Sequence, residues 1–264
     1  MTDPIRQPKI LVVNPNTTPA ITAMVAAEVA RLLGGAAEVV PATGRFGAHY
    51  IASRAAAAIA AHAALDAFAG HGADCDAVLL ACFGDPGLDA LKELAGVPVV
   101  GLAEASCHLA CQMGSRFGIV TGGERWGAML AEFVASRGLA ARLAGIRTVA
   151  PSGADIARDP DGSLALLARA AQVCVDADGA ECVILGGAGL AGLARRIQPQ
   201  VSVPVVCSVH AGVEMLQAAL RLRAPKAATG SFATAAPVGS TGLSQALAAL
   251  LAGRGRPARR HGRA

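Results

Sequence analysis

An internal repeat limits the possible folds of this chain more than any other feature. Three segments of the first half resemble three segments of the second half, in the same order and at a nearly constant offset. The pairs are AVLLACFGDPGL (77–88) with CVILGGAGLAGL (182–193), VPVVGLAEA (97–105) with VPVVCSVHA (203–211), and ILVVNPNTT (10–18) with FGIVTGGER (117–125). One match between Val-rich segments could arise by chance, but three in order indicate two similar structural units.

Short β-branched runs alternate with Ala-rich helical stretches, which is typical of an α/β fold with a mainly parallel sheet. The pattern predicts two similar Rossmann-like lobes, related by pseudo-two-fold symmetry, with a cleft between them. The predicted strands are Lys9–Val13, Ala77–Ala81, Val97–Val100, Phe117–Val120, Val183–Leu185 and Val203–Val206, and the predicted helices include Pro19–Leu33, Leu88–Leu94 and Val213–Leu222. We expect residues 8–112 with 213–250 to form the first lobe, residues 113–212 the second lobe, and residues 251–264 a disordered basic tail.

Composition narrows the class of protein. Hydrophobic residues make up 53% of the chain, while aromatic residues make up only 3%, so stacking platforms for nucleic acid are not expected. Five arginines lie in the last eleven residues, and without them the net charge of +4 becomes −1, so the basic character belongs to the tail. There is no secretory signal pattern and no apolar run long enough to span a membrane. Seven cysteines without an export signal indicate reduced thiols in the cytoplasm.

Polar residues follow the first predicted strand. Asn14, Asn16, Thr17 and Thr18 come directly after it, and Thr18 precedes Pro19, a favoured first residue of a helix. Thr18 is therefore expected to cap that helix. Ligands of open α/β sheets bind beyond the carboxyl ends of the strands, so these side chains are candidates for substrate binding. The alternative is that they only make a strand-to-helix turn.

Cys82 directly follows the predicted strand Ala77–Ala81, and Phe83, Gly84 and Asp85 come next. A cysteine before a glycine turn at a strand's carboxyl end is placed to project into the cleft, and neighbouring backbone amides would lower its pKa. On position alone, Cys82 is either a catalytic thiol or a small buried hydrophobic residue.

Glycine turns follow two strands of the second half. Thr121 and Gly122 follow one strand, and Gly187 and Ala188 follow another, so backbone amides there can approach an anion closely. The pattern does not match a dinucleotide fingerprint, and no cysteine or histidine cluster has metal-ligand spacing, so we expect neither cofactor nor metal. Cys207 stands at the cleft end of the last predicted strand.

The segments NPNTT, ACFGDPGLDAL, PVVGLAEA and RFGIVT resemble the hydantoin and allantoin racemase branch of the aspartate/glutamate/hydantoin racemase family, over about residues 8–220. The resemblance implies a cofactor-independent isomerase that moves a proton at the carbon next to a carbonyl, using one cysteine from each lobe. It implies that Cys82 is one acid/base, and that Asn14 and strand-end amides hold the substrate's carbonyls. In the family's second motif a cysteine stands where this chain has Gly187.

Three hypotheses for function remain. The chain is a racemase or epimerase of hydantoins, amino acids or related small molecules, with Cys207 or His210 in place of the second cysteine. Alternatively, it is a one-cysteine, stereospecific decarboxylase or lyase. A third possibility is a small-molecule-binding protein that has lost the chemistry. In each case we expect a small-molecule ligand, no nucleic-acid or membrane partner, and a homo-oligomer.

Overall fold

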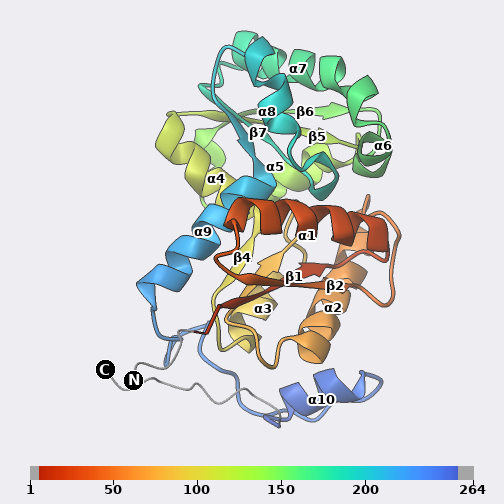
Figure 1. The fold of residues 1–264 in the computed structure, drawn as a ribbon, viewed down its shortest axis with the longest axis vertical. Helices are drawn as coiled ribbons and strands as arrows, with labels where there is room; N and C mark the ends of the chain where they lie inside the picture. The colour runs from red at the N-terminus through yellow and green to blue at the C-terminus, as the bar shows by residue number, and fades with distance from the viewer. Residues whose placement is uncertain (1–5, 255–264) are drawn as a thin grey trace.

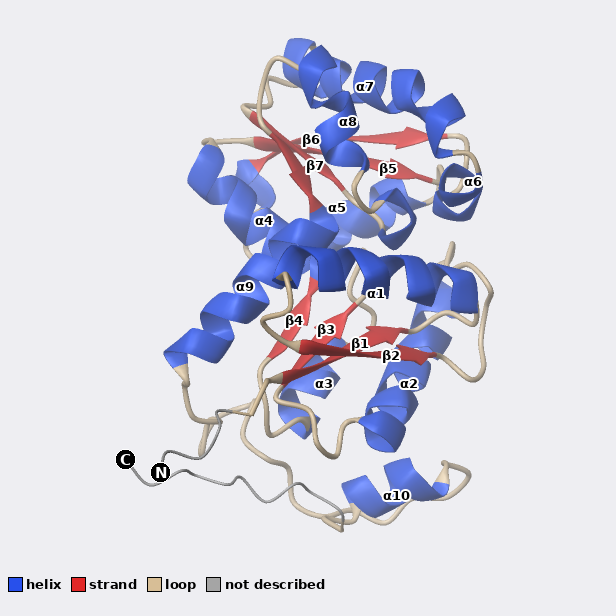
Figure 2. Cartoon of the chain, in the orientation of Figure 1, coloured by secondary structure: helices blue, strands red, loops and turns tan. Residues whose placement is uncertain are grey.

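The computed structural model describes residues 6–254, and it consists of two stacked α/β lobes (Figure 1). Each lobe contains one four-stranded sheet with helices on its faces (Figure 2). The first sheet contains β1 (Lys9–Asn14), β2 (Glu38–Thr43), β3 (Ala77–Leu80) and β4 (Val99–Gly101). The second contains β5 (Phe117–Gly122), β6 (Leu143–Val149), β7 (Cys182–Leu185) and β8 (Val205–Cys207).

The strand orders of the two sheets are equivalent. They run β2-β1-β3-β4 and β6-β5-β7-β8, and every neighbouring pair is parallel. All eight strands therefore direct their carboxyl ends the same way within their own lobe. The predicted fold class, two similar parallel-sheet lobes, is confirmed.

Helices connect the strands. In the first lobe these are α1 (Pro19–Leu33), α2 (Arg54–His71) and α3 (Leu88–Leu94). In the second lobe they are α5 (Trp126–Ser136), α6 (Gly153–Arg158), α7 (Pro160–Asp176) and α8 (Leu193–Ile197), with short 3₁₀ turns η1 (Ala140–Arg142), η2 (Ala188–Leu190) and η3 (Gln198–Gln200). The predicted bounds of the helices at Pro19 and Leu88 match the structure.

The sequence analysis missed strands β2 and β6, which are the edge strands of the two sheets. β2 contains Pro41, a residue that interrupts a strand pattern but is tolerated at a sheet edge, where no partner needs its N–H. Six of the seven residues of β6 are only partly buried, and its sequence LAGIRTV contains Arg and Thr, so it has no continuous apolar run. Edge strands lack the continuous hydrophobic run that identifies a central strand of a parallel sheet.

Two helices cross between the lobes. Helix α4 (Leu102–Met113) follows the first sheet and packs against β7, while α9 (Ser208–Leu222) follows the second sheet and packs against β3 and α1. The two helices also pack against each other at the boundary (Figure 1). This exchange ties the lobes together, because each sheet is covered partly by a helix that follows the other sheet.

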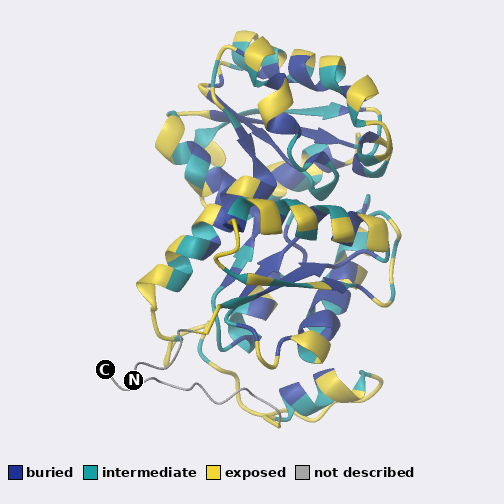
Figure 3. Ribbon diagram, in the orientation of Figure 1, coloured by how far each residue is buried: buried dark blue, intermediate teal, exposed yellow. Residues whose placement is uncertain are grey.

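The central strands form the core. Every residue of β3 and β7 is buried, and the burial colours show the same dark interior in both lobes (Figure 3). Strands covered on both faces bury apolar side chains on each side, which explains why AVLL and CVIL contain no polar residue.

After α9 the chain runs without regular structure to α10 (Gln245–Leu251), which packs against α2. Most of the predicted basic tail, residues 255–264, lies outside the described residues. Between residues 6 and 254 no helix is long and apolar enough to cross a membrane. In the same range no cluster of three or more His, Cys, Asp and Glu side chains has the arrangement of a metal site.

Candidate active site

A pocket of about 490 Å³ of empty space, including its open mouth, lies between the lobes. Its lining comes from strand ends and the loops that follow them, as expected for parallel sheets. The first lobe contributes Asn16, Ile21, Tyr50, Ile51, Ala81, Cys82 and Phe83. The second contributes Thr121, Trp126, Gly153, Ala154, Gly187, Ala188, Gly189 and Leu190. The structure thus brings Cys82 and Gly187, equivalent positions of the repeat, to one pocket.

Cys82 lies in the turn after β3. An N–H···O bond of 3.0 Å from Asp85 N to Cys82 O closes this turn. Cys82 is partly exposed at the pocket wall. Burial of the thiol still raises the pKa of Cys82 to about 12, with the Asp85 carboxylate adding to the rise. The predicted lowering of this pKa by turn amides is therefore wrong. Desolvation disfavours the thiolate more than the turn stabilises it, so the resting group is a neutral thiol.

Among the described residues that line the opposite wall of the pocket, none carries a thiol. Gly187 has a φ of +144°, a conformation that side chains of L-residues rarely adopt. Its N–H donates to the hydroxyl of fully buried Ser208 over 3.2 Å. The 3₁₀ turn η2 follows, and the first amides of such a turn, those of Ala188 and Gly189, have no acceptor within it. This wall supplies space and backbone donors.

Asn14 and Asn16 have different roles. Asn14 is fully buried and does not line the pocket; its Nδ2 donates to Asn16 Oδ1 and Thr22 Oγ1 over 2.8 and 2.9 Å. Asn16 Oδ1 also accepts the Thr18 N–H. Because that oxygen is occupied, the Asn16 NH₂ group is the end left to donate to a ligand. Asn14 therefore lies behind Asn16 and not at the pocket wall, and its implied contact with a substrate carbonyl stays a prediction.

The cap predicted for α1 is also different. Thr18 is the N-cap residue, but its side chain makes no capping bond. The Thr18 hydroxyl donates instead to His49 O over 2.8 Å, so it joins two loops of the first lobe.

Two residues that the sequence analysis missed close the pocket across the lobes. The Tyr50 hydroxyl donates to Gly122 O and accepts the Gly153 N–H, both over 3.1 Å. In the other direction, Trp126 Nε1 donates to Ile51 O over 3.1 Å. The sequence contains a single Trp and a single Tyr, and both line this pocket. Their rarity in the composition could have marked them as candidate site residues.

Several predicted site residues lie outside the lining. Thr17 bonds through its hydroxyl to His49 Nδ1, Gly122 accepts from Tyr50, Gly84 is absent from the pocket wall, and Asp85 is directed towards helix α4. The predicted residues that do line it are Cys82, Asn16, Phe83, Thr121, Gly187 and Ala188.

Neither substitute for a second cysteine faces the pocket. Cys207 is buried among core residues at the end of β8 and is not among the lining residues. His210 is half-exposed on α9, 3.3 Å from Glu214.

The fold and the pocket define a class: a two-lobed, parallel α/β protein with a strand-end thiol facing the other lobe. A family profile described as Asp/Glu/Hydantoin racemase matches residues 10–216. This chain belongs to that family.

Sequence relatives agree with this assignment. A hydantoin racemase from Paenarthrobacter aurescens is 37% identical over 224 residues, 81% of this chain and 92% of the relative. A hydantoin racemase from Pseudomonas sp. (strain NS671) is 34% identical over 210 residues, 79% of this chain and 84% of the relative. These relatives are isomerases.

Solved structures show the same fold. Allantoin racemase from Pseudomonas fluorescens superposes with a TM-score of 0.85 at 31% identity, covering 89% of this chain and all of that one. A structure of arylmalonate decarboxylase superposes with a TM-score of 0.60 at 19% identity, covering 82% and 94%. The second likeness concerns the fold alone.

Proposed function

We propose that this protein is a cofactor-independent racemase or epimerase that moves a proton at the carbon next to a carbonyl of a small, hydantoin-like substrate. The observation that carries the proposal is the position of Cys82, at a strand end in the inter-lobe pocket of a racemase-family fold. The identity with two hydantoin racemases supports the same class of substrate.

The proton transfer needs a base, an acid and donors for an oxyanion. Cys82, as thiolate, takes the proton from the carbon, and the electron pair of the broken C–H bond moves to the carbonyl oxygen. We assign the stabilisation of that oxygen to the Asn16 NH₂ group and the amides of η2, because these residues line the pocket and preorganised donors stabilise an oxyanion. For inversion, a proton must reach the opposite face of the carbon; because the described lining of that wall holds no thiol, we assign this proton to a water molecule that enters through the open mouth of the pocket. The carbonyl then re-forms, and Cys82 releases its proton to the hydroxide left behind.

The lining also favours an uncharged substrate. None of the fifteen described residues that line the pocket is an Asp, Glu, Lys, Arg or His. Recognition of a free carboxylate normally uses a cation, most often a bidentate arginine. A neutral ring with carbonyl and N–H groups is matched instead by Asn16, Thr121 and backbone amides. Ile21, Ile51, Phe83, Trp126 and Leu190 provide apolar surface for a substituent.

A second candidate function is proton transfer to one face only, as in a stereospecific decarboxylase. The neutral Cys82 thiol, and the absence of a thiol from the described lining of the opposite wall, favour it. The lack of a lining cation weighs against a dicarboxylate as its substrate.

Incubation of each enantiomer of a 5-substituted hydantoin in D₂O, followed by NMR and chiral chromatography, separates the candidates. Deuterium uptake with loss of optical purity is expected for the racemase. Uptake with retention would replace it by the one-face enzyme. No uptake with hydantoins, amino-acid amides or free amino acids would refute the proposal.

A further inference from the structure

The Cys82 turn is anchored by a buried carboxylate that does not touch the pocket. Asp85 is only 4% exposed, and its two oxygens accept the N–H groups of Ala103 and Glu104 over 3.0 and 2.8 Å. These are amides of the first turn of α4, which otherwise lack intrahelical acceptors. A residue from a different segment therefore caps this helix.

The sequence is built to accept this contact. Gly101, the residue just before helix α4, leaves space for the Asp85 carboxylate, because a Cβ atom on residue 101 would overlap that carboxylate. Asp85 itself has a φ of +46°, which is uncommon for a non-glycine residue and costs conformational energy. A strained backbone held by two charge-assisted hydrogen bonds indicates that this geometry is needed.

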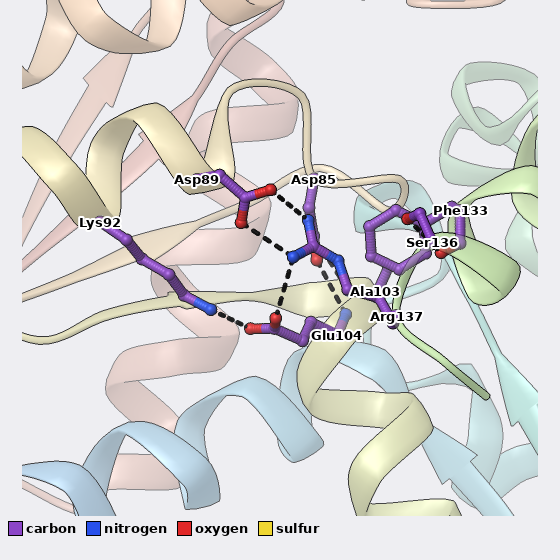
Figure 4. A network of polar contacts seen from close by, with 8 residues as sticks. All are labelled: Asp85, Asp89, Lys92, Ala103, Glu104, Phe133, Ser136 and Arg137. Atoms are coloured by element: carbon purple, nitrogen blue, oxygen red, sulfur yellow. Dashed lines mark hydrogen bonds and ion pairs between the residues drawn. The ribbon is translucent and has the colours of Figure 1, made fainter. Parts of the chain in front are cut away.

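The network around Asp85 joins the two lobes (Figure 4). Arg137, at the end of α5, pairs with Asp89 of α3 over 2.8 Å and with Glu104 of α4 over 3.4 Å. Lys92 also pairs with Glu104. The charged groups near Asp85 are thus Glu104, Arg137, Asp89 and Lys92, and the nearby thiols are Cys82 and Cys107.

We propose that Asp85 is a positioning residue for Cys82. Its carboxylate fixes the turn that carries the thiol onto the first turn of the inter-lobe helix α4, and it places a negative charge beside the thiol. The assignment of Cys82 as the reacting group rests on the proposed function, but the anchor and the charge do not.

The electrostatic consequence has a definite sign. Burial raises the pKa of Asp85 to about 7, against the opposing effect of its two N–H donors and Arg137. Above that pH the carboxylate is ionised and disfavours a thiolate at Cys82. The Tyr50 hydroxyl is also a titratable group near the thiol. Removing the charge should let Cys82 ionise at lower pH.

The test is alkylation of Cys82 by iodoacetamide without substrate, followed by mass spectrometry from pH 7 to pH 10. Asp85→Asn is expected to react roughly tenfold faster than wild type at pH 8.5, equivalent to a pKa lower by about one unit. Asp89→Asn, which removes an exposed carboxylate of the same network, is the matched control and should leave the profile unchanged. An Asp85→Asn profile equal to wild type, or slower at every pH, would overturn the proposal.

Two further measurements cover the other outcomes. If Asp85→Asn does not fold, Asp85→Glu keeps the charge but displaces the anchor. In hydrogen exchange its Ala103 and Glu104 amides should exchange at least tenfold faster than in wild type; unchanged protection refutes the anchor. In α-proton exchange, Asp85→Asn should lower kcat with KM unchanged. Because alkylation needs no substrate, a protein inactive on hydantoins still tests the positioning role.

Discussion

The turn after β3 and the turn after β7 occupy equivalent places in the two lobes, yet they contribute different chemistry. The first presents the Cys82 thiol and is anchored through Asp85 to α4. The second has Gly187 at the equivalent position, with a φ of +144° and its N–H bonded to Ser208. Two similar folds thus form an asymmetric pocket, in which one wall carries a proton and the other carries backbone donors.

Removal of the thiol tests this asymmetry most strongly. Cys82→Ala is expected to lower the rate of α-proton exchange by about 10²–10⁴-fold, the usual contribution of a positioned acid/base. NMR in D₂O measures the rate. Cys111→Ser, on α4 away from the pocket, serves as the control and should retain activity. Exchange that continues in Cys82→Ala would show that the other wall carries the proton.

The pH dependence of the thiol sharpens the comparison. Because burial raises the pKa of Cys82 to about 12, its thiolate fraction is small at pH 7 and grows as pH rises. Alkylation of wild-type Cys82 is therefore expected to increase about tenfold per pH unit from pH 7 to pH 10. Peptide mapping after timed iodoacetamide treatment provides the rates. A plateau below pH 9 would mean that the turn stabilises the thiolate after all.

A cysteine placed at 187 would make the two walls alike. The added Cβ would lie 3.0 Å from Leu190 Cδ1 in a backbone conformation unfavourable for it, so Gly187→Cys should cost about 1–3 kcal/mol of stability. Gly187→Ala carries the same strain without the thiol. Thermal denaturation should therefore show a similar loss for both variants.

Only the cysteine variant should increase loss of optical purity relative to deuterium uptake. Chiral chromatography measures that ratio. Equal ratios in the Cys and Ala variants would contradict the view that the second wall lacks only a proton carrier.

The inter-lobe bonds of Tyr50 offer a smaller effect. Tyr50→Phe removes a hydroxyl that makes two hydrogen bonds, one with Gly122 and one with Gly153, at a cost of about 0.5–1.5 kcal/mol for each. We expect a higher KM and faster alkylation of Cys82, because the pocket opens more readily. His71→Phe, in the last turn of α2 away from the lining, is a comparison for a surface change. An unaltered KM would mean that Tyr50 does not hold the pocket closed.

The smallest effect is expected at Cys207. Because it is buried outside the lining, Cys207→Ala should leave the exchange rate and its stereochemistry within about twofold of wild type, in line with additivity for independent sites. The same NMR and chiral assays apply. Loss of racemisation with exchange retained would restore Cys207 as the second acid/base.

The sequence by itself determined the architecture, the bounds of α1 and α3, and the location of the thiol. Hydrophobic runs, the repeat and helix-start residues are visible in the sequence itself, so they can be recognised without knowledge of tertiary contacts. The edge strands β2 and β6 were not predicted, because a partly buried strand does not need a continuous apolar sequence.

Only the tertiary structure decided which strand-end residues face a ligand. Asn14 and Asn16 are two positions apart, yet one is enclosed by Asn16 and Thr22 while the other lines the pocket. Tyr50 and Gly122 are brought together by inter-lobe packing across 72 residues. The pKa of Cys82 was misjudged for the same reason: local amides can be read from a turn, but desolvation depends on everything that packs around the sulfur.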